Sequence, residues 1–389
     1  MIDGNVYIVS WSMNCAMGTD PDEISRKLLN GVPGRHIVHP QLHIPHFVLS
    51  DHDSRGNIHE AACELSLAEV RKAMREAFPQ EEHPEKRWKI GCVAGTTSDV
   101  QFNDLDFFRE WPDKVVHEEE LQKFFSGTVA EKISRKLGFS GPAITISNTC
   151  VSGSEAVIQG STLIKSGHCD AVVVLGVDLT SEMSLSGFYT LSAASLDVAK
   201  PFDASRSGMN VGEGVGCVIL QSAGCCREYN HTARFRLCGG GSAGDAYHLT
   251  APHPQGAGLQ DAIRQALKQA ELAPEDIAFV NAHGTGTLPN DSSEVYALAE
   301  TIGKEVKYFS TKALTGHTFG AAGVIELIFC MICLREKTVP GSCNCAEPDK
   351  ALQMAPVMAK TEISGRIAMS TNLAFGGNNT ALIVEMAGE

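Results

Sequence analysis

The sequence holds one cysteine and two histidines whose neighbours suit chemistry on a thioester. Cys150 lies where an apolar strand pattern ends and a helical pattern begins. We expect a lowered pKa for its thiol, because unpaired N–H groups at a helix start favour the thiolate nucleophile. His283 begins the string His-Gly-Thr-Gly-Thr, and His317 ends the string Thr-Lys-Ala-Leu-Thr-Gly-His. Small neighbours leave room for a substrate, although an inert buried cysteine and structural histidines are the alternative interpretation.

Two further segments could support such a site. Glu326 lies inside an otherwise apolar helical pattern, and a buried carboxylate needs a partner because an unpaired buried charge is costly. Lys312 is the nearest candidate partner by sequence, so we expect the two side chains to pair. Phe375 precedes two glycines in a turn between two strand patterns, and such a turn suits the presentation of backbone N–H groups.

Two other patterns are weaker. Residues 239–244, Gly-Gly-Gly-Ser-Ala-Gly, match the dinucleotide-binding pattern, but no helix opens after them, so a plain turn is expected. Cys330 and Cys333, followed by Cys343 and Cys345, have a spacing that some zinc sites use. Because the first pair lies in an apolar helical pattern, we expect core cysteines there, an exposed loop pair after them and no metal site.

Composition narrows the class of protein. The chain has 389 residues, is 43% hydrophobic and carries a net charge of −14. So acidic a chain argues against a general nucleic-acid binder. The 13 cysteines are odd in number and scattered singly, unlike those of a secreted disulfide framework. The N-terminus lacks a signal-peptide pattern and no apolar stretch could span a bilayer, so we expect a cytoplasmic protein without a membrane partner.

The elements that must position these residues alternate along the chain. Apolar runs predict strands at 5–10, 89–94, 143–147, 171–177, 234–238, 277–281, 307–310, 368–371 and 381–385. Residue spacing predicts helices at 22–29, 60–78, 118–137, 154–165, 259–270, 292–302 and 323–335. This alternation indicates an α/β fold. The rhythm repeats, which suggests two halves of one fused unit: 1–232 with Cys150, and 233–389 with both histidines.

With these motifs in view, the chain resembles the decarboxylating, elongating β-ketoacyl-acyl-carrier-protein synthases of the thiolase superfamily, which use a Cys-His-His set. The resemblance covers nearly the whole chain. Besides the turn at Cys150, it is carried by the segments 201–214, 245–252, 283–287, 311–317 and 375–377 in that order. It implies a thiolase-like fold of duplicated βαβαβαββ halves in an α-β-α-β-α layered body. It also implies a dimer in which strand 171–177 pairs across the two-fold axis.

The resemblance further implies a reaction. Cys150 would take an acyl group from the phosphopantetheine of an acyl-carrier protein. Malonyl-carrier protein would then lose CO2, and the resulting carbanion would attack the acyl group on Cys150. His283 and His317 would stabilise the enolate oxygen, and the N–H groups of Cys150 and Phe375 would hold the acyl oxygen. No cofactor beyond the carrier's own phosphopantetheine is expected.

Supporting roles follow from the same resemblance. Lys312 would pair with Glu326 and fix the loop of the second histidine. Thr250, Thr285 and Thr287 would bind the pantetheine arm. An acidic carrier would need a local basic patch on this acidic chain. Two expected helices offer one, although these residues could equally be ordinary solvated faces: Arg71, Lys72, Arg75, Lys132, Arg135 and Lys136.

Two departures from the family pattern concern the acyl chain. Leu373 stands where many relatives have Phe, and Phe319 stands where Leu is common. Neither changes the expected reaction type, but both bear on acyl preference. Fatty-acid elongation is the leading interpretation. The alternatives are a ketosynthase subunit of a type II polyketide or polyene pathway, as a homodimer or with a chain-length subunit, and a non-catalytic subunit. The retained Cys150 argues against the last.

Overall fold

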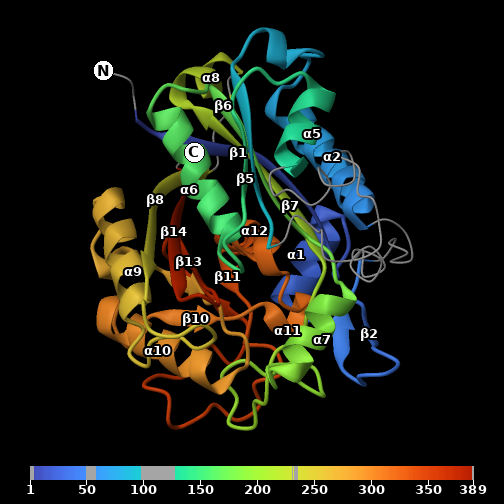
Figure 1. Ribbon diagram of the computed structural model, residues 1–389. Coiled ribbons are helices and arrows are strands. Elements are labelled where there is room, and N and C mark those ends of the chain that lie inside the picture. The colour runs from blue at the N-terminus through green and yellow to red at the C-terminus, as the bar shows by residue number, and fades with distance from the viewer. Residues whose placement is uncertain (1–3, 50–57, 98–127, 230, 232–234, 388–389) are drawn as a thin grey trace.

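The computed structural model describes residues 4–49, 58–97, 128–229, 231 and 235–387 (Figure 1). In the first half the main strands are β1 (Val6–Cys15), β4 (Ile90–Gly95), β5 (Ala143–Ile146), β6 (Ala171–Asp178) and β7 (Gly214–Ser222). In the second they are β8 (Phe235–Gly244), β9 (Phe279–Asn281), β10 (Lys307–Phe309), β13 (Ile367–Leu373) and β14 (Asn378–Met386). Two small hairpin-like pairs are β2 (His36–Val38) with β3 (Pro45–Phe47), and β11 (Thr338–Val339) with β12 (Thr361–Glu362).

Helices connect these strands in both halves. The first half has α1 (Pro21–Leu29), α2 (Ile58–Ala77), α5 (Thr128–Leu137), α6 (Ser152–Lys165), α7 (Glu182–Thr190) and α8 (Ala223–Glu228). The second has α9 (Ala257–Ala270), α10 (Leu288–Thr301), α11 (Lys312–Thr315) and α12 (Ala322–Arg335), with the short 3-10 turn η4 (Phe319–Ala321) before α12. The expected helices at 22–29, 60–78, 154–165, 259–270, 292–302 and 323–335 are therefore present. Residues 118–127 of the expected helix 118–137 lie outside the described part.

The ten main strands form one sheet in the order β10-β9-β13-β14-β8-β1-β7-β6-β4-β5. Outward from β1, the pairings run antiparallel, antiparallel, parallel and parallel, and the same series runs outward from β8. The two series meet where Val6–Ile8 pairs with Phe235–Leu237. The expected duplication is thus a duplication of topology, and the halves are one body as expected. A division at 232/233 stays a prediction, because residues 232–234 are not described.

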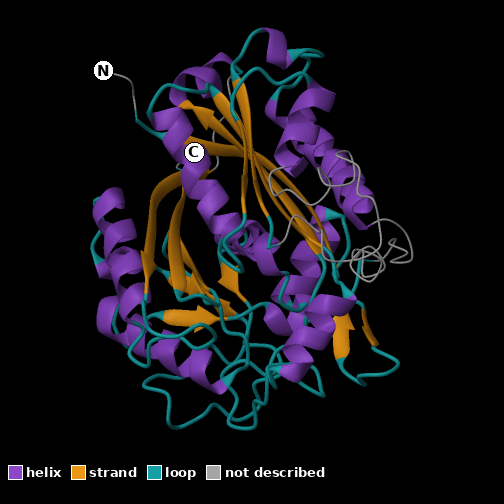
Figure 2. Cartoon of the chain, viewed as in Figure 1, coloured by secondary structure: helices purple, strands orange, loops and turns teal. Residues whose placement is uncertain are grey.

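The molecule has five layers. Helices α6 and α12 lie between the two parts of the sheet and pack on both (Figure 2). Helices α2 and α5 cover the outer face of the first half, and α9 and α10 cover that of the second. This is the α-β-α-β-α arrangement expected from the sequence. Because α12 is enclosed on every side, it has no polar face, and Ala322–Leu334 is buried throughout.

Close contact between α6 and α12 depends on glycine. A Cβ atom at Gly153 would lie 2.5 Å from the carbonyl oxygen of Gly320, and one at Gly323 would lie 2.3 Å from the backbone nitrogen of Ser154. Neither position tolerates a side chain without moving backbone. The two helix starts can therefore approach closely, which brings the loop before α6 next to the loop before α12.

The structure corrects three expectations about strands. β6 is hydrogen-bonded to β7 on one side and β4 on the other, so it cannot pair across a two-fold axis; β5 is the edge strand of the first half. Residues 239–244 are not a turn but the end of β8. A Cβ at Gly241 would lie 2.0 Å from the carbonyl oxygen of Ala262 in α9, so the glycines let strand and helix approach. The strand β7 was not expected, because glycines interrupt its apolar pattern.

The cysteines also differ in part from expectation. Cys330 and Cys333 are core residues of α12, as predicted, but Cys345 is buried and Cys343 half-buried, so that loop pair is not exposed. Across the ranges described, no group of three or more potential metal ligands occurs. Within the same ranges, no helix has both the length and the apolar composition needed to cross a membrane.

Candidate active site

Cys150 sits in a tightly held turn between β5 and α6. Thr149 adopts a left-handed conformation, with φ 47°. The Ser152 hydroxyl accepts a hydrogen bond from the Asn148 N–H at 2.8 Å and donates one to the Thr149 carbonyl at 2.6 Å. Left-handed backbone at a non-glycine residue costs free energy and persists only where its surroundings enforce it. The turn therefore presents the Cys150 thiol in one orientation, 7% exposed, at the start of α6.

The loop of His283 is held by a buried carboxylate that the sequence did not reveal. Glu294 of α10 accepts the N–H groups of His283 and Gly284, each at 2.7 Å, and the Thr371 hydroxyl at 2.7 Å. Its side chain is fully buried. The available signal was an acidic residue on the inward face of the expected helix 292–302. Glu294 connects β9, α10 and β13, and so fixes where the imidazole of His283 projects.

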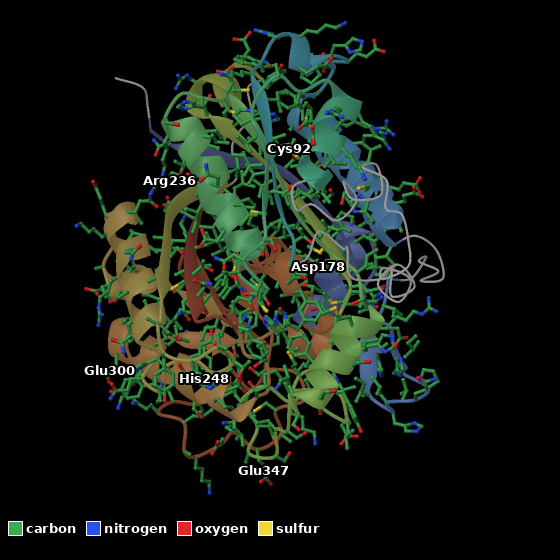
Figure 3. All side chains as sticks on the ribbon, in the orientation of Figure 1. Cys92, Asp178, Arg236, His248, Glu300 and Glu347 are labelled. Carbon is green, nitrogen blue, oxygen red and sulfur yellow. The ribbon has the colours of Figure 1, made fainter. Side chains whose placement is uncertain are left out.

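The loop of His317 is held from the first half of the chain. The His317 N–H donates to the Asn210 carbonyl at 2.7 Å. Three residues later, the Gly320 N–H donates to the Asp178 carboxylate at 2.6 Å. That carboxylate also accepts the Thr96 hydroxyl and the Thr97 N–H, each at 2.9 Å, and lies in the interior of the molecule (Figure 3). Asp178 ends an all-apolar strand, and only the fold reveals its partner across the halves.

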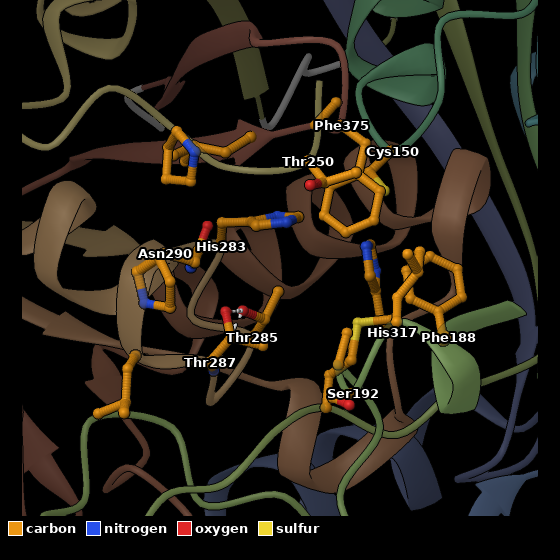
Figure 4. Close-up of a pocket in the computed structure, with 18 of the residues that line it drawn as sticks. Cys150, Phe188, Ser192, Thr250, His283, Thr285, Thr287, Asn290, His317 and Phe375 are labelled. Carbon is orange, nitrogen blue, oxygen red and sulfur yellow. Dashed lines mark hydrogen bonds between the residues drawn. The ribbon is translucent and has the colours of Figure 1, made fainter. Parts of the chain in front are cut away.

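These loops enclose one cavity of about 310 Å³. His283 and His317 enter from different sides and point toward the region of Cys150 and Phe375 (Figure 4). The two imidazole centroids lie 4.9 Å apart, with the rings nearly perpendicular at 87°. Seven of the nine site residues expected from the sequence line the cavity: Cys150, Thr250, His283, Thr285, Thr287, His317 and Phe375. The structure therefore brings together residues separated by more than 200 positions.

The two remaining expected residues form the predicted pair behind the cavity. Lys312 Nζ and Glu326 Oε1 are 2.5 Å apart, and both side chains are almost completely buried. The second carboxylate oxygen, Glu326 Oε2, accepts the Asn372 amide at 2.5 Å. Neither residue lines the cavity. Their effect on the site is therefore positional and electrostatic.

Burial keeps both imidazoles neutral. It lowers the pKa of His283 and of His317 well below the usual value, and the nearby Lys312 ammonium lowers each further. Nδ1 of His283 and both ring nitrogens of His317 have no hydrogen-bond partner in the described part of the chain, although all three are buried. Buried polar atoms are usually paired. Two neutral rings with free nitrogens can donate a hydrogen bond to an oxygen atom or accept a proton.

The expected low pKa of Cys150 is wrong. Burial raises the pKa of its thiol to about 12, and the carboxylates of Asp178 and Glu326 act in the same direction. The Lys312 ammonium opposes this effect, but it is already paired with Glu326. A helix start favours a thiolate only where desolvation does not outweigh it. The resting nucleophile is therefore a thiol, and its proton must leave during the reaction.

The threonines and Phe375 form part of the cavity wall. The hydroxyls of Thr285 and Thr287 are hydrogen-bonded to each other at 2.8 Å. The Phe375 carbonyl accepts the Thr149 hydroxyl at 3.0 Å, which joins the glycine-rich turn after β13 to the turn of Cys150. Phe375 also contacts Phe188 of α7, with ring centroids 5.5 Å apart. The sequence did not single out Phe188, because its helix was not expected.

The basic residues considered for carrier binding lie on α2 and α5, which contact each other (Figure 1). Arg71, Arg75 and Lys136 are exposed. Lys72 pairs with Glu69 at 2.7 Å, and Arg135 pairs with Glu131 at 2.7 Å. Lys132 contacts His59 of α2. The six basic residues therefore lie on two adjacent helices, where Glu69 and Glu131 offset part of their charge.

Comparison with known proteins agrees with this geometry. Residues 57–224 match the family model "Beta-ketoacyl synthase, N-terminal domain", and residues 235–346 match "Beta-ketoacyl synthase, C-terminal domain". The chain is 31% identical to 3-oxoacyl-[acyl-carrier-protein] synthase 2 of Coxiella burnetii, over 65% of this chain and 64% of that protein. It is 32% identical to the Staphylococcus aureus protein of the same name, over 65% and 63%. These alignments span less than two thirds of either relative.

Solved structures match over almost the full length. A ketosynthase of Xenorhabdus doucetiae, solved in complex with its chain length factor, is 29% identical with a TM-score of 0.84 and 98% coverage of both chains. A β-ketoacyl synthase of Burkholderia phymatum is 25% identical with a TM-score of 0.91 and complete coverage of both. The ishigamide ketosynthase/chain length factor is 25% identical with a TM-score of 0.89, covering 99% of both.

Proposed function

Because the chain belongs to the β-ketoacyl synthase family, we propose that it is a β-ketoacyl-acyl-carrier-protein synthase that elongates an acyl group held on Cys150. The observation that carries this proposal is the convergence of one thiol and two neutral imidazoles on one cavity. The cavity lies between the two halves of the chain, where each half supplies reactive groups that the other lacks. A cofactor is not required by this chemistry, since the substrates arrive on the phosphopantetheine of the carrier protein.

The first half-reaction transfers the acyl group. Cys150 Sγ attacks the thioester carbonyl carbon, and the carrier's sulfur leaves. Because burial raises the pKa of the Cys150 thiol to about 12, proton removal accompanies the attack. A neutral imidazole with an unpartnered nitrogen, His317 or His283, is the base available in the cavity, and the departing sulfur takes up the proton. The N–H groups of Cys150 and Phe375 hold the oxygen as it becomes negative.

The second half-reaction forms the carbon–carbon bond. The bond between the malonyl carboxylate and the α-carbon breaks, CO2 leaves, and the electron pair passes into an enolate. Neutral His283 and His317 donate hydrogen bonds to the enolate oxygen, in a buried site where such bonds are strong. The enolate carbon then attacks the acyl carbon and displaces Cys150 as a thiolate, which takes up a proton from water. The product is an acyl chain longer by two carbons on the carrier protein.

Other residues support the reaction without reacting. Burial holds both imidazoles neutral, and the ammonium of Lys312, paired with Glu326, lowers their pKa further. Thr250, Thr285 and Thr287 line the cavity, where they bind the pantetheine arm. The carrier protein docks on the exposed basic residues of α2 and α5. Pairing of β5 edges from two chains would form the dimer; dimerisation and a cytoplasmic location remain predictions.

A second candidate is a ketosynthase subunit of a type II polyketide or polyene pathway, paired with a chain-length subunit. One observation favours it. Two of the solved structures that match nearly the whole chain, at 29% and 25% identity, hold a ketosynthase with a chain length factor. The active site is the same in both candidates, so the distinction concerns the partner chain and the acyl substrate.

The proposal is tested by incubating the purified protein with acyl-carrier protein and then with malonyl-carrier protein. We expect an acyl adduct on Cys150 by mass spectrometry, followed by CO2 release and a β-ketoacyl product. Cys150→Ala should lose the adduct and the product, whereas Cys92→Ala, a buried cysteine in β4, should retain both. Wild-type protein that forms no adduct on Cys150 would contradict the catalytic role.

The choice between the candidates rests on a separate measurement. Co-expression of the chain with homologous subunits encoded beside it, followed by size-exclusion chromatography, distinguishes a homodimer from a heterodimer. A homodimer that elongates saturated acyl groups supports the fatty-acid assignment. Condensation activity that appears only with a second subunit supports the other candidate.

A further inference from the structure

The space beside Cys150 is filled by aromatic rings. Phe319 follows His317 by two residues and is 4% exposed. Its ring lies 5.2 Å from that of His317 and 5.3 Å from that of Phe188, with which it is stacked at 29°. Phe188 in turn contacts Phe375 at 5.5 Å. Phe188 and Phe375 line the cavity, whereas Phe319 lies behind Phe188 and does not.

The ring of Phe319 also belongs to the apolar cluster around the Cys150 thiol. Cys150 and Phe319 belong to one buried cluster with Ile44, Leu185, Met209 and Val211. An apolar chain attached to Sγ would extend into apolar surroundings, and this cluster is where the structure provides them. The cluster is already packed, however, and a long chain could enter only if a ring moved.

The backbone shows that Phe319 is held in place against its own preference. Its φ is 48°, a left-handed conformation in which a large side chain is uncommon. Glycine would adopt this conformation without strain. A bulky residue in a strained conformation next to reactive groups indicates a role for the side chain itself.

The volume of the cavity also indicates that little space lies beside Cys150. At about 310 Å³ it lies near the lower end of the range for ligand pockets. Under the proposed function the pantetheine arm and the acyl group share this volume, with the arm at Thr285 and Thr287 and the acyl group at Cys150. We propose that Phe319, acting through Phe188, limits the acyl group on Cys150 to short chains. This inference rests on the proposed function, since it concerns the substrate of the same site.

The test measures how fast Cys150 is acylated by butanoyl-pantetheine and by octanoyl-pantetheine, using intact-protein mass spectrometry. We expect the wild-type protein to react at least ten times faster with the butanoyl compound. Phe319→Leu and Phe319→Ala should reduce this ratio at least fivefold by making room for the longer chain. Phe329→Leu in α12 makes the same change at a fully buried position outside the Cys150 cluster, and should leave the ratio unchanged.

The outcomes separate the two proposals. Acylation by neither compound contradicts the proposed function and this inference with it. Acylation by both at similar rates in the wild-type protein, or an unchanged ratio in the Phe319 variants, contradicts this inference alone. If the Phe319 variants do not fold, Phe188→Leu provides the second test, because that side chain is only half-buried. A ratio that stays unchanged in Phe188→Leu would also overturn the role of the stacked rings.

Discussion

The two halves of the molecule have the same strand arrangement and different chemistry. In the first half, β5 leads to Cys150 and β6 ends at Asp178. In the second, β9 leads to His283 and β10 leads to Lys312 and then His317. The equivalent edge strands β5 and β10 therefore both lead to residues of one cavity, and each half contributes residues the other lacks. Duplication explains why the groups meet, and residue identity explains what they can do.

The two helices of the middle layer show most clearly how the two halves differ in the surroundings of their acidic residues. Helix α12 is buried on all sides and contains Glu326, whose charge requires Lys312. Helix α6 has a partly exposed face, and its acidic residue, Glu155, is half-buried and contacts the Ser242 hydroxyl. An acidic residue in the first turns of each helix thus has a different environment. The second half has a buried ion pair next to the reactive groups, and the first half has none among the residues described.

The largest expected effect tests this contrast. Lys312→Met leaves Glu326 buried without its cation, and should lower the free energy of unfolding by about 3–5 kcal/mol. Glu155→Gln, at the half-buried position of α6, should change it by about 0.5 kcal/mol or less. Urea denaturation measures both. The double variant Lys312→Met/Glu326→Gln should recover part of the loss, because Gln can still accept the Asn372 amide. If Lys312→Met and Glu155→Gln lowered the free energy of unfolding equally, the acidic residues of α12 and α6 would not differ in their environment.

The next effect concerns the buried carboxylate of the first half. Burial raises the pKa of Asp178 from 3.8 to about 7, so the folded state binds the proton more tightly than the unfolded state. Stability from this group is complete below pH 3.8 and falls as pH rises through 7. The change is on the order of 4 kcal/mol, since one pKa unit corresponds to about 1.4 kcal/mol.

Asp178→Asn should therefore flatten the pH dependence of the unfolding free energy between pH 4 and 7. Asp261→Asn, at an exposed position of α9, should not. Glu294 retains its own dependence in both variants, because burial raises its pKa from 4.5 to about 7. Urea titrations at several pH values provide the measurement. An unchanged slope in Asp178→Asn would show that its carboxyl titrates normally.

The third largest expected effect concerns the two active-site histidines. His283→Ala and His317→Ala each remove one donor to the developing enolate oxygen, which should lower CO2 release from malonyl-carrier protein by about 10²–10³-fold. The first half contributes no imidazole to the cavity among the residues described, so no substitute donor exists there. His168→Ala, at an exposed position outside the cavity lining, is the control. Retention of decarboxylation in either active-site variant would place its donor elsewhere.

A smaller effect compares the two buried carboxylates directly. In Asp178→Asn, the amide oxygen can accept both N–H groups while the NH2 group donates to the Thr96 hydroxyl, so all three hydrogen bonds persist. In Glu294→Gln, the oxygens that bind the His283 N–H and the Gly284 N–H differ, so one N–H faces an NH2 group. That clash costs about 1–3 kcal/mol. Condensation activity should therefore fall more in Glu294→Gln. A larger fall in Asp178→Asn would show that the loop of His317 depends on a charged carboxylate more than the loop of His283 does.

The smallest expected effect concerns basic residues on the outer helices. Arg135→Glu in α5 should raise the KM for acyl-carrier protein by about two- to fivefold, because exposed charge pairs contribute about 0.2–1 kcal/mol. Arg264→Glu in α9, on the outer layer of the other half, should leave the KM unchanged. Added salt should weaken carrier binding to the wild-type protein. An equal rise of the KM in both variants would mean that the carrier protein does not prefer the outer helices of the first half.

Local patterns in the sequence identified most elements and the residues of the site. The turn at Cys150 and the loops of His283 and His317 follow apolar strands, and a polar residue after such a strand can be recognised without a fold. The partner of Glu326 was also predictable, since a carboxylate in an apolar helix needs a nearby cation. These inferences succeeded because each depends on neighbours within about fifteen residues along the chain.

Contacts between distant segments were not accessible in this way. The turn expected at 239–244 is a strand, in which Gly239 and Gly241 face the backbone of α9 rather than solvent. Strand β6 lies inside the sheet, although an apolar run by itself does not distinguish an interior strand from an edge. Asp178 binds the Gly320 N–H from 142 residues away, and nothing near either residue indicates this bond.

Residue types and their order were enough to indicate the thiol, the two imidazoles, the buried ion pair and a repeated α/β architecture, because these follow from local pattern and charge. Only the tertiary structure decided how the groups behave. Enclosure by both halves raises the pKa of Cys150 and lowers that of both histidines, and the packing of Phe319 against Phe188 narrows the space beside the thiol. Desolvation and packing depend on what surrounds a residue in space, which the fold alone establishes.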